Sequence, residues 1–389
     1  MNLYDALGGT VNCRKLATAF YARVARDPIL RPLFHGKTFK CAIEEFSAFL
    51  VQFLGGPSED TQRRWWLSLH ESHTRFKIGP RERDAWMKNM VRALDDVQID
   101  EPARSALRSL FERSSAYVIN TGPAPAVRRE RGEPSKDALH QEISARWTAQ
   151  CTLDQAVAAV RSGEAERAIS LAESSTLRTL FTNNRSTLAA LLATMIARGH
   201  EAILLYVREK LSADPALAKE RYSGRTLLHA AAAAGNAAIV KLLLQLGANP
   251  DVLDSGGHTP LYSVANECRA PGGADVVRAL AQAGANVNAR DGVKHCTALH
   301  MAARRGNVEI AEALLDCGAE IELKDSLGET PLRRAVNCNK ANVVALLVSK
   351  GADIHSKGSK GLTPLLAARS TATQRILEFS RRENVGSTR

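Results

Sequence analysis

The sequence lacks the features that mark several large classes of protein. Its seven cysteines include no C-x-x-C pair, and their odd number argues against a disulfide framework. We therefore expect a reducing compartment and a cytoplasmic protein. The first nine residues lack a basic start followed by an apolar stretch, and the most apolar segment, 188–197, is too short to span a bilayer. We expect neither a secretory signal nor a membrane anchor.

Motifs for common enzyme chemistry are also missing. The chain has no nucleotide-binding glycine loop, metalloprotease motif or nucleophile elbow, and no flavin or nicotinamide fingerprint. Its formal net charge of +11 would suit an acidic partner or nucleic acid. The lysines and arginines do not form a stripe with interleaved aromatic residues, so we interpret the charge as a solvated basic surface and do not expect nucleic acid binding.

The composition changes along the chain. Residues 1–121 hold most of the phenylalanines and three of the four tryptophans, and their apolar residues recur at helical spacing, as in Leu16, Phe20 and Val24. Residues 122–144 begin with proline, glycine and charges of both signs, which predicts a linker. The remainder is rich in alanine and leucine. Because no useful stretch alternates apolar and polar residues, we predict an all-α protein of two modules.

A short motif recurs in the second half of the chain. It begins at five threonines whose steps are 33, 38, 33 and 33 residues, namely Thr226, Thr259, Thr297, Thr330 and Thr363. In the first four units a Gly-Ala pair follows the motif, beginning at Gly247, Gly284, Gly318 and Gly351. This pattern resembles the ankyrin repeat, a helix pair that buries its apolar face only by stacking on its neighbours. The resemblance implies a helical solenoid over residues 224–381.

The repeat unit can be interpreted residue by residue. The threonine hydroxyl should cap the first helix, and the glycine should end the second helix in a left-handed conformation. His229 and His300 follow their threonines by three positions, and we expect a structural hydrogen bond there rather than metal binding. Residues 145–223 show helix-pair spacing without the motif, which predicts degenerate repeats. The longer second unit should have an enlarged tip at residues 269–273, a candidate partner surface.

The candidate chemistry lies in the first module, around His73. The relevant motifs are Leu3-Tyr-Asp-Ala-Leu-Gly-Gly9, Phe20-Tyr21, Asp27-Pro28, Leu33-Phe34, Gly55-Gly-Pro57, His73-x-x-Phe76-x-Ile78 and Arg83-Asp-Ala-Trp86. They span nearly all of residues 1–121 in the order found in group II truncated haemoglobins, which this module resembles. The resemblance implies a two-over-two truncated globin fold around haem b.

The same resemblance implies roles for individual residues. His73 is the expected proximal iron ligand, and His70, one helical turn earlier, is the alternative that the H-x-x-F-x-I register disfavours. Phe76 would pack on the porphyrin, while Tyr21 and Trp86 would face the bound ligand. The residues expected to complete the pocket are Phe34, Ala42 and Phe46, and those expected near the haem propionates are Arg64, Arg75 and Lys77. Ala42 stands where many globins place a distal histidine.

Three functions remain open at this stage. The leading prediction is a haem protein for binding or transport of dioxygen, carbon monoxide or nitric oxide, with an ankyrin module that holds a protein partner. A second is an enzyme, such as a nitric oxide dioxygenase or a peroxidase, which would need an external reductase because the chain has no flavin or nicotinamide fingerprint. A third is an ankyrin adaptor whose globin is structural only.

Overall fold

The computed structural model describes residues 3–36, 38–57, 68–121, 138–358 and 361–386, with the backbone course alone for residues 70–71 and 383–386. Contacts between Cα atoms divide the chain into two compact units. The first holds residues 1–162 and 167–183, and the second holds residues 163–166 and 184–389. The prediction of an all-α fold is confirmed, since the only strands in the described ranges are two strands of two residues each, which form one hairpin.

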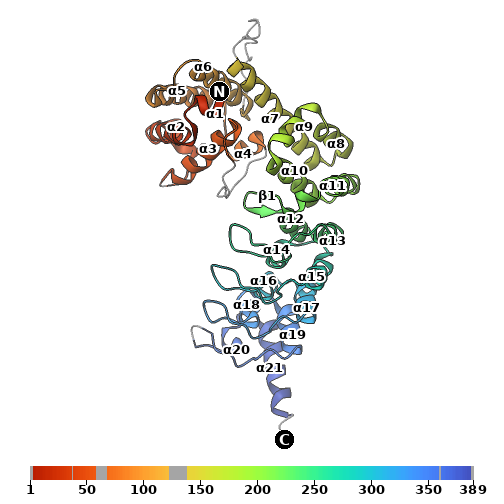
Figure 1. Ribbon diagram of the computed structural model, residues 1–389. Coiled ribbons are helices and arrows are strands. Elements are labelled where there is room, and N and C mark those ends of the chain that lie inside the picture. The colour runs from red at the N-terminus through yellow and green to blue at the C-terminus, as the bar shows by residue number, and fades with distance from the viewer. Residues whose placement is uncertain (1–2, 37, 58–67, 122–137, 359–360, 387–389) are drawn as a thin grey trace. The chain divides into compact units, whose positions relative to one another are not determined.

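Up to residue 121, the first unit consists of two pairs of long helices and several short helices (Figure 1). Its elements up to residue 121 are α1 (Leu3–Ala6), α2 (Gly9–Val24), the 3-10 helix η1 (Arg31–Leu33), α3 (Lys40–Phe53), α4 (Leu69–His73), α5 (Pro80–Val97) and α6 (Ala103–Tyr117). Helix α2 contacts both α3 and α5, and α5 contacts α6. The core between them includes Leu16, Phe20 and Val24, which the helical spacing of the sequence predicted to share one face.

The sequence explains where α5 begins and ends. Pro80 occupies the first turn, where a missing N–H costs nothing, and the Glu82 carboxylate accepts a hydrogen bond of 2.9 Å from the Gly79 N–H. The helix ends at Gln98, whose φ of 55° is left-handed. This start fixes the register of α5 and thereby the direction of Trp86, six residues into the helix.

Three further helices belong to the first compact unit, wholly or for the most part: α7 (Ala138–Ser162), α8 (Ala165–Ala172) and α9 (Ser175–Asn183). Helix α7 begins inside the segment 122–144 that we predicted to be linker, so residues 138–144 of that segment are helical. Leu139 and Ile143 are buried in the core of the first unit. The compact units therefore do not coincide with the predicted segments, because an apolar face in a sequence does not say what it packs against. The predicted domain boundaries themselves stay a prediction.

The second unit is a stack of helix pairs. Its elements are α10 (Arg185–Arg198), α11 (Glu201–Ala213), the 3-10 helix η2 (Pro215–Lys219), β1 (Arg221–Tyr222), β2 (Arg225–Thr226), α12 (Leu227–Ala233), α13 (Ala237–Gln245), α14 (Pro260–Glu267), α15 (Gly273–Gln282), α16 (Ala298–Arg305), α17 (Val308–Asp316), α18 (Pro331–Asn337), α19 (Ala341–Ser349), α20 (Pro364–Ala367) and α21 (Thr371–Gly386). First helices contact first helices (α12, α14, α16, α18), and second helices likewise (α13, α15, α17, α19).

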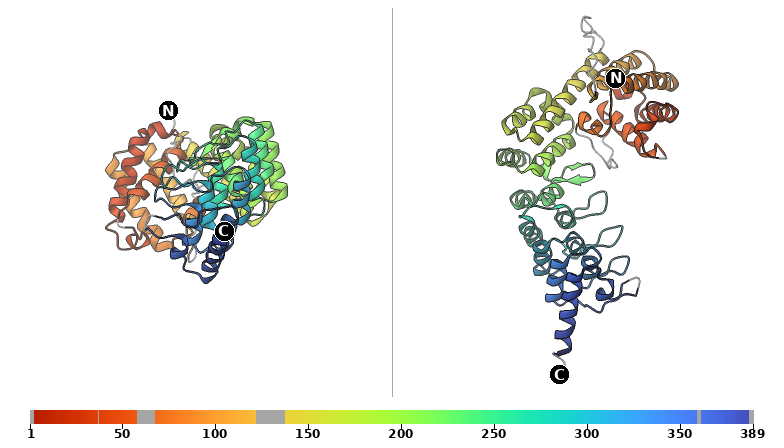
Figure 2. Two further views of the ribbon diagram at one scale, coloured as in Figure 1. Left: turned by 90° about the horizontal axis from the view of Figure 1, so that it is seen from below. Right: turned by 180° about the vertical axis from the view of Figure 1, so that it is seen from behind.

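Loops join each second helix to the next first helix. Within the stack they all project from one side, as Figure 1 shows from the front and Figure 2 from behind. Each loop ends at the expected threonine cap, as at Thr259, whose hydroxyl oxygen accepts a hydrogen bond of 3.2 Å from the Tyr262 N–H. Gly318, with a φ of 90°, closes α17 in the left-handed conformation that the sequence predicted.

His229 and His300 have the structural role expected of them. His300 is 1% exposed, and its Nδ1 accepts a hydrogen bond of 3.2 Å from the Thr297 N–H. Its other ring nitrogen, Nε2, donates to the Glu329 carbonyl of the next loop at 3.0 Å. His229 makes the equivalent pair of bonds to Thr226 and to the His258 carbonyl. Each histidine therefore ties one repeat to the loop of the next.

The insertion in the second regular unit lengthens the turn between α14 and α15 to residues 268–272. The turn packs tightly against both neighbours. A Cβ on Gly272 would collide with the Gly235 carbonyl oxygen of the preceding turn, and the Asn307 side chain of the following turn donates a hydrogen bond of 3.3 Å to the Cys268 carbonyl. In the described residues of the whole chain, no helix is both long and apolar enough to cross a membrane.

Candidate functional site

The short helix α4 ends at His73 and is held at that end by Asn120. The Asn120 side-chain amide donates hydrogen bonds to the carbonyl oxygens of His73, at 3.1 Å, and Phe76, at 2.7 Å. Its carbonyl oxygen accepts one of 2.9 Å from the Ile78 N–H. The turn that carries His73 and Phe76 is thus fixed by Asn120, three residues after the end of α6.

The hydrogen bonds of the His73 ring select one tautomer. Nδ1 lies 2.8 Å from the Leu69 carbonyl oxygen and 2.7 Å from the Ser72 hydroxyl oxygen. A carbonyl oxygen only accepts, so Nδ1 carries the proton. This tautomer leaves the ring lone pair on Nε2, which is the form of an imidazole that ligates a metal.

Aromatic side chains surround Tyr21, which projects from α2. Its ring stacks on Phe39 at a centroid distance of 5.4 Å and meets Phe34 and Phe46 edge-on at 5.7 Å and 6.4 Å. These are favourable packing geometries for aromatic pairs. Burial, with a further contribution from the charge of Glu45, raises the pKa of the Tyr21 phenol above its usual value. The phenol therefore keeps its proton and can act as a hydrogen-bond donor.

Two further ring contacts connect this group to His73. Phe34 lies 5.6 Å from Phe76, and Phe76 lies 6.3 Å from the His73 ring, measured between centroids. Phe34 therefore contacts both Tyr21 and Phe76, so residues from α2, the loop after η1 and the turn after α4 gather in one place. From the sequence we expected Tyr21, Phe34, Phe76 and His73 to line a single pocket.

Trp86 enters the same aromatic group from α5. Its ring lies 5.2 Å from Phe20 and 5.6 Å from Phe111, and Phe20 in turn lies 5.1 Å from Tyr21. Trp86 and Tyr21 are thus joined through one intervening ring. Ala42, which the sequence resemblance placed in the distal-histidine position, is partly buried in the first turn of α3.

Cationic side chains lie next to the His73 turn. The guanidinium carbon of Arg75 stands 4.8 Å from the centre of the Phe76 ring, a cation–π distance, and Lys77 is exposed beside it. Arg64, the third cation that the sequence suggested for haem propionates, lies outside the described residues, as does the side chain of His70.

These residues fit a haem. The donor set is one imidazole with its lone pair on Nε2, the surrounding surface is mainly aromatic, and cations stand at its edge. The half-buried side chains in this group are Tyr21, Phe34, Phe46, His73, Phe76 and Trp86, whereas core neighbours such as Leu16 and Val24 are fully buried. A flat apolar group could cover the ring faces that remain exposed.

Three contributors were not predicted from the sequence. Ser72 and Asn120 hold the His73 turn through hydrogen bonds, and Phe39 stacks on Tyr21. Phe39 could have been included, since it belongs to the run of aromatic residues that begins at Phe34. Asn120 is 47 residues from His73, and no local pattern connects the two.

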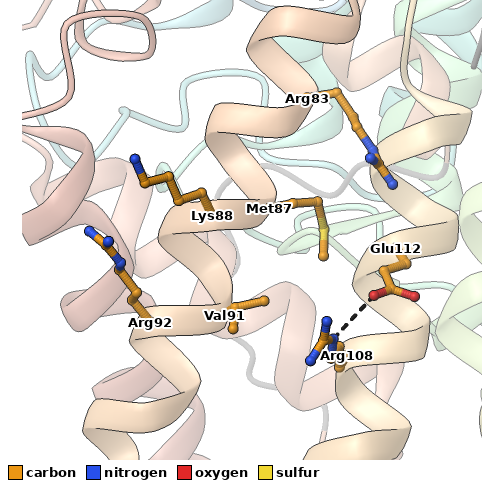
Figure 3. Close-up of a pocket in the computed structure, with 7 residues that line it drawn as sticks. All are labelled: Arg83, Met87, Lys88, Val91, Arg92, Arg108 and Glu112. Atoms are coloured by element: carbon orange, nitrogen blue, oxygen red, sulfur yellow. Dashed lines mark hydrogen bonds and ion pairs between the residues drawn. The ribbon is translucent and has the colours of Figure 1, made fainter.

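A separate groove of about 350 Å³ lies between α5 and α6, and its seven lining residues are drawn in Figure 3. Met87 and Val91 provide apolar surface, while Arg83, Lys88, Arg92 and Arg108 provide positive charge. Arg108 forms an ion pair of 3.2 Å with Glu112, the one carboxylate among them. None of these residues takes part in the ring contacts around Tyr21, so the groove is distinct from the site containing His73.

Two helix pairs with a histidine at the end of a short connecting helix define the first unit as a globin, and the second unit is an array of ankyrin repeats. Family comparisons agree with both assignments: the bacterial-like globin family matches residues 2–120, and ankyrin repeats match residues 190–291 and 268–358. The chain belongs to the truncated haemoglobin family, group 2, and carries ankyrin repeats after its globin. Both resemblances inferred from the sequence are confirmed.

The matches to other globins extend over most of each relative's length. "Group 2 truncated hemoglobin YjbI" of Bacillus subtilis is 32% identical over 117 residues, which is 30% of this chain and 87% of the relative. "Two-on-two hemoglobin-3" of Arabidopsis thaliana is 30% identical over 121 residues, which is 30% of this chain and 69% of the relative. Membership of this family implies a haem cofactor.

The ankyrin relatives match over a smaller part of their length. "Ankyrin repeat and SOCS box protein 16" of Mus musculus is 44% identical over 115 residues, which is 30% of this chain but only 24% of the relative. The similarity concerns the repeats, which serve as a protein-interaction module. It identifies no partner.

Proposed function

We propose that the globin binds haem b through His73 and holds dioxygen, carbon monoxide or nitric oxide, while the ankyrin array binds a protein partner. The hydrogen bond of 2.8 Å from His73 Nδ1 to the Leu69 carbonyl carries this proposal, because it sets the tautomer that presents Nε2 to a metal. When bound, haem supplies an iron centre to which a diatomic gas can coordinate. We place the protein in the cytoplasm, where its cysteines, none of which forms a disulfide, stay reduced.

In this proposal, Tyr21 and Trp86 face the diatomic ligand. Dioxygen in such a site carries partial negative charge, which a phenol O–H or an indole N–H can stabilise by donating a hydrogen bond. Burial keeps the Tyr21 phenol protonated. The aromatic side chains around it keep water from competing for the ligand, which makes such a hydrogen bond stronger than it would be in solvent.

The other site residues shape the pocket. Phe76 packs on the porphyrin beside His73, and Phe34 and Phe46 form the apolar wall around Tyr21. Ala42 adds a small side chain in the distal position. Arg75 and Lys77, just after His73, are placed to neutralise the haem propionates at the edge of the pocket.

An absorption spectrum of the chain expressed with a supply of haem tests the proposal. We expect a Soret band that is lost or much weakened in His73→Ala and retained in His70→Ala, because only His73 would supply the axial bond. The reverse pattern would move the ligand to His70. A wild-type chain without a Soret band would instead favour an ankyrin adaptor whose globin is structural only.

The same pocket is compatible with an enzyme that consumes nitric oxide or peroxide. Tyr21 and Trp86 would then orient the ligand for reaction rather than only retain it. The dioxygenase reaction also needs electrons from an external reductase, since the chain has no flavin or nicotinamide fingerprint. Nitric oxide consumption that depends on an added reductase would distinguish this enzyme from a simple carrier.

For the ankyrin module we propose that two neighbouring loops, the one between α15 and α16 and the one between α17 and α18, bind an acidic, partly apolar segment of a partner protein. Val293 and Leu327 in these loops are 71% and 56% exposed. Three exposed cations lie in the same loops, Arg290, Lys294 and Lys324, and Arg304 is exposed in the last turn of α16. Apolar contacts with complementary charge are the usual features of a binding surface.

Asp291 and Asp325 of these loops are directed inward, whereas Glu320 and Glu322 of the loop before α18 are exposed. Asp291 is 5% exposed, and its Oδ1 accepts hydrogen bonds from the N–H groups of Lys294, at 2.7 Å, and Cys296, at 3.2 Å. Asp325 is 6% exposed and pairs with Arg334, whose Nε lies 2.6 Å from its Oδ2. Asp291 and Asp325 therefore hydrogen-bond within the fold, and Arg290, Lys294 and Lys324 are the exposed charges nearest in sequence to Val293 and Leu327 that an acidic segment would pair with.

A labelled peptide of alternating glutamate and leucine, added to the full-length chain, tests this surface by fluorescence anisotropy. Binding should weaken as salt rises, and Lys294→Glu with Lys324→Glu should abolish it. Lys241→Glu, an exposed cation on the second helix α13, is the matched control and should bind as wild type. Equal affinity of all variants would rule out the proposed surface.

A further inference from the structure

Helix α7 lies beyond the end of the globin family match at residue 120, yet it packs as a part of the globin. Leu139 and Ile143 belong to the same buried cluster as Leu3 and Phe111, and Ile143 is only 1% exposed. Helix α7 contacts α1, α4 and α6, all within the first compact unit.

Polar contacts along α7 reach three other parts of the globin. Near its start, Glu142 Oε2 accepts a hydrogen bond of 3.2 Å from the Leu3 N–H. One turn later, the Arg146 guanidinium donates one of 3.1 Å to the Phe53 carbonyl at the end of α3. Trp147 meets Tyr117 of α6 edge-on at 5.5 Å. These contacts fix the position of α7 against the globin.

The contact of greatest consequence is that of Asp154 with α4, the helix that ends at His73. Asp154 Oδ1 lies 3.1 Å from the N–H of Leu69, the first residue of that helix. An N–H in the first turn has no partner within its own helix, so Asp154 supplies one from another helix. The carbonyl of the same Leu69 accepts the hydrogen bond from His73 Nδ1 at 2.8 Å. Leu69 therefore links Asp154 to the imidazole, through its N–H on one side and its carbonyl on the other.

Asp154 is itself held in place from two sides. Its side chain is buried, at 4% exposure, and the Gln150 amide donates a hydrogen bond of 2.9 Å to its Oδ1. The Tyr117 hydroxyl donates another; burial, together with the Asp154 charge, raises the pKa of that phenol. Helices α6 and α7 thus aim one carboxylate at the start of α4.

We propose that Asp154 is a positioning residue for His73 and that the haem-binding module of this chain extends through α7. This inference rests on the proposed role of His73 as the haem ligand. The hydrogen bond on Nδ1 sets both the direction of the imidazole and its strength as a ligand. By fixing Leu69, Asp154 keeps that hydrogen bond short.

The test uses the full-length chain with three substitutions. Asp154→Ala removes the acceptor, and Asp154→Asn keeps an oxygen in its place. Glu142→Ala breaks a different hydrogen bond between α7 and the globin without touching α4. It is the matched control for a loss of packing alone.

The first readout is the iron–histidine stretching band in the resonance Raman spectrum of the reduced, ligand-free protein. Asp154→Ala should move the band to lower frequency and speed haem transfer to apomyoglobin about 10-fold, the low end of the effect of losing a residue that orients a ligand. Asp154→Asn should stay close to wild type, and Glu142→Ala should leave the band in place. Equal bands in Asp154→Ala and wild type would overturn the proposal.

The second readout is hydrogen–deuterium exchange of residues 69–73 in the haem-free chain, which is independent of any haem property. Exchange should be faster in Asp154→Ala but not in Glu142→Ala. Unchanged exchange in Asp154→Ala would overturn the proposed contact. A wild-type chain without a Soret band would remove the proposed function and the positioning role together, whereas a normal Soret band with an unmoved Raman band would remove the positioning role alone.

Discussion

The hydroxyl oxygen of Ser72 lies 2.7 Å from Nδ1 of His73, its neighbour in the sequence. The same hydroxyl donates a hydrogen bond of 2.7 Å to the Leu69 carbonyl, so towards His73 it acts as the acceptor. The N–H of the imidazole is therefore shared between two oxygens within one helical turn. Both oxygens belong to α4, so the direction of the ring depends on how that helix is held.

Ser72→Ala tests this arrangement. It removes one acceptor but leaves the Leu69 carbonyl, so we expect haem to be retained. The free energy of unfolding of the haem-free chain should fall by about 1 kcal/mol, the usual contribution of one hydrogen bond, in urea titrations. Ser72→Thr keeps the hydroxyl and serves as the control. Complete loss of haem from Ser72→Ala would make Ser72, not Leu69, the principal partner of the ring.

Tyr21→Phe should release dioxygen faster. A hydrogen bond to a charged group contributes about 1.5–3 kcal/mol, which corresponds to about a 10- to 100-fold rise in the dissociation rate. Carbon monoxide, which is less polar when bound, should respond less, and Trp86→Phe should act in the same direction as Tyr21→Phe. Stopped-flow dissociation of both gases measures the effect.

The control for that experiment is Tyr4→Phe, which removes a phenol that hydrogen-bonds to Thr10 elsewhere in the globin. Dioxygen should leave this variant at the wild-type rate. If both gases also left Tyr21→Phe at the wild-type rate, Tyr21 would be a packing residue and the distal assignment would be wrong.

Regular spacing made much of the fold predictable. The threonine caps, left-handed glycines and buried histidines of the repeats follow from local rules, and each is present at positions such as Thr259, Gly318 and His300. The packing partner of helix α7 could not be predicted from the sequence. Its apolar residues predict a buried face, but the choice between the globin and the repeats depends on contacts such as that of Ile143, which no periodicity records.

The candidate site divides in the same way. His73, Phe76 and Trp86 belong to motifs that can be recognised in sequence, and the structure brings the rings near them together. Asn120 and Asp154 orient α4 through hydrogen bonds across 47 and 85 positions of the chain. Such partners cannot be recognised from the neighbouring sequence, because a polar side chain at those positions would be predicted to lie on the surface.

Limited proteolysis should cut the chain into two fragments that stay bound to each other in native buffer. The composition of residues 122–137 makes that segment the expected cleavage site. Because Leu139 and Ile143 of α7 are buried with the globin core, the two pieces should elute together in native size-exclusion chromatography and part only in denaturant. An isolated globin fragment in native buffer would contradict the packing of α7. Cleavage first within residues 20–110 would contradict the domain organisation.

The stability of the ankyrin array should depend on pH through His229. Its side chain is fully buried, and burial, partly offset by the hydrogen bond to the His258 carbonyl, lowers its pKa from 6.5 to about 4. The unfolded state therefore binds more protons than the folded state between these values, so stability falls as the pH falls below 6.5 and is unaffected above about pH 7. At pH 5 the loss should be about 2 kcal/mol, from about 1.4 kcal/mol per pKa unit.

Urea unfolding at pH 7.5 and pH 5 measures this loss of stability. His229→Gln should reduce the difference between the two pH values, whereas His355→Gln, which changes an exposed side chain, should leave it unchanged. Equal pH dependence in wild type and His229→Gln would show that another group is responsible.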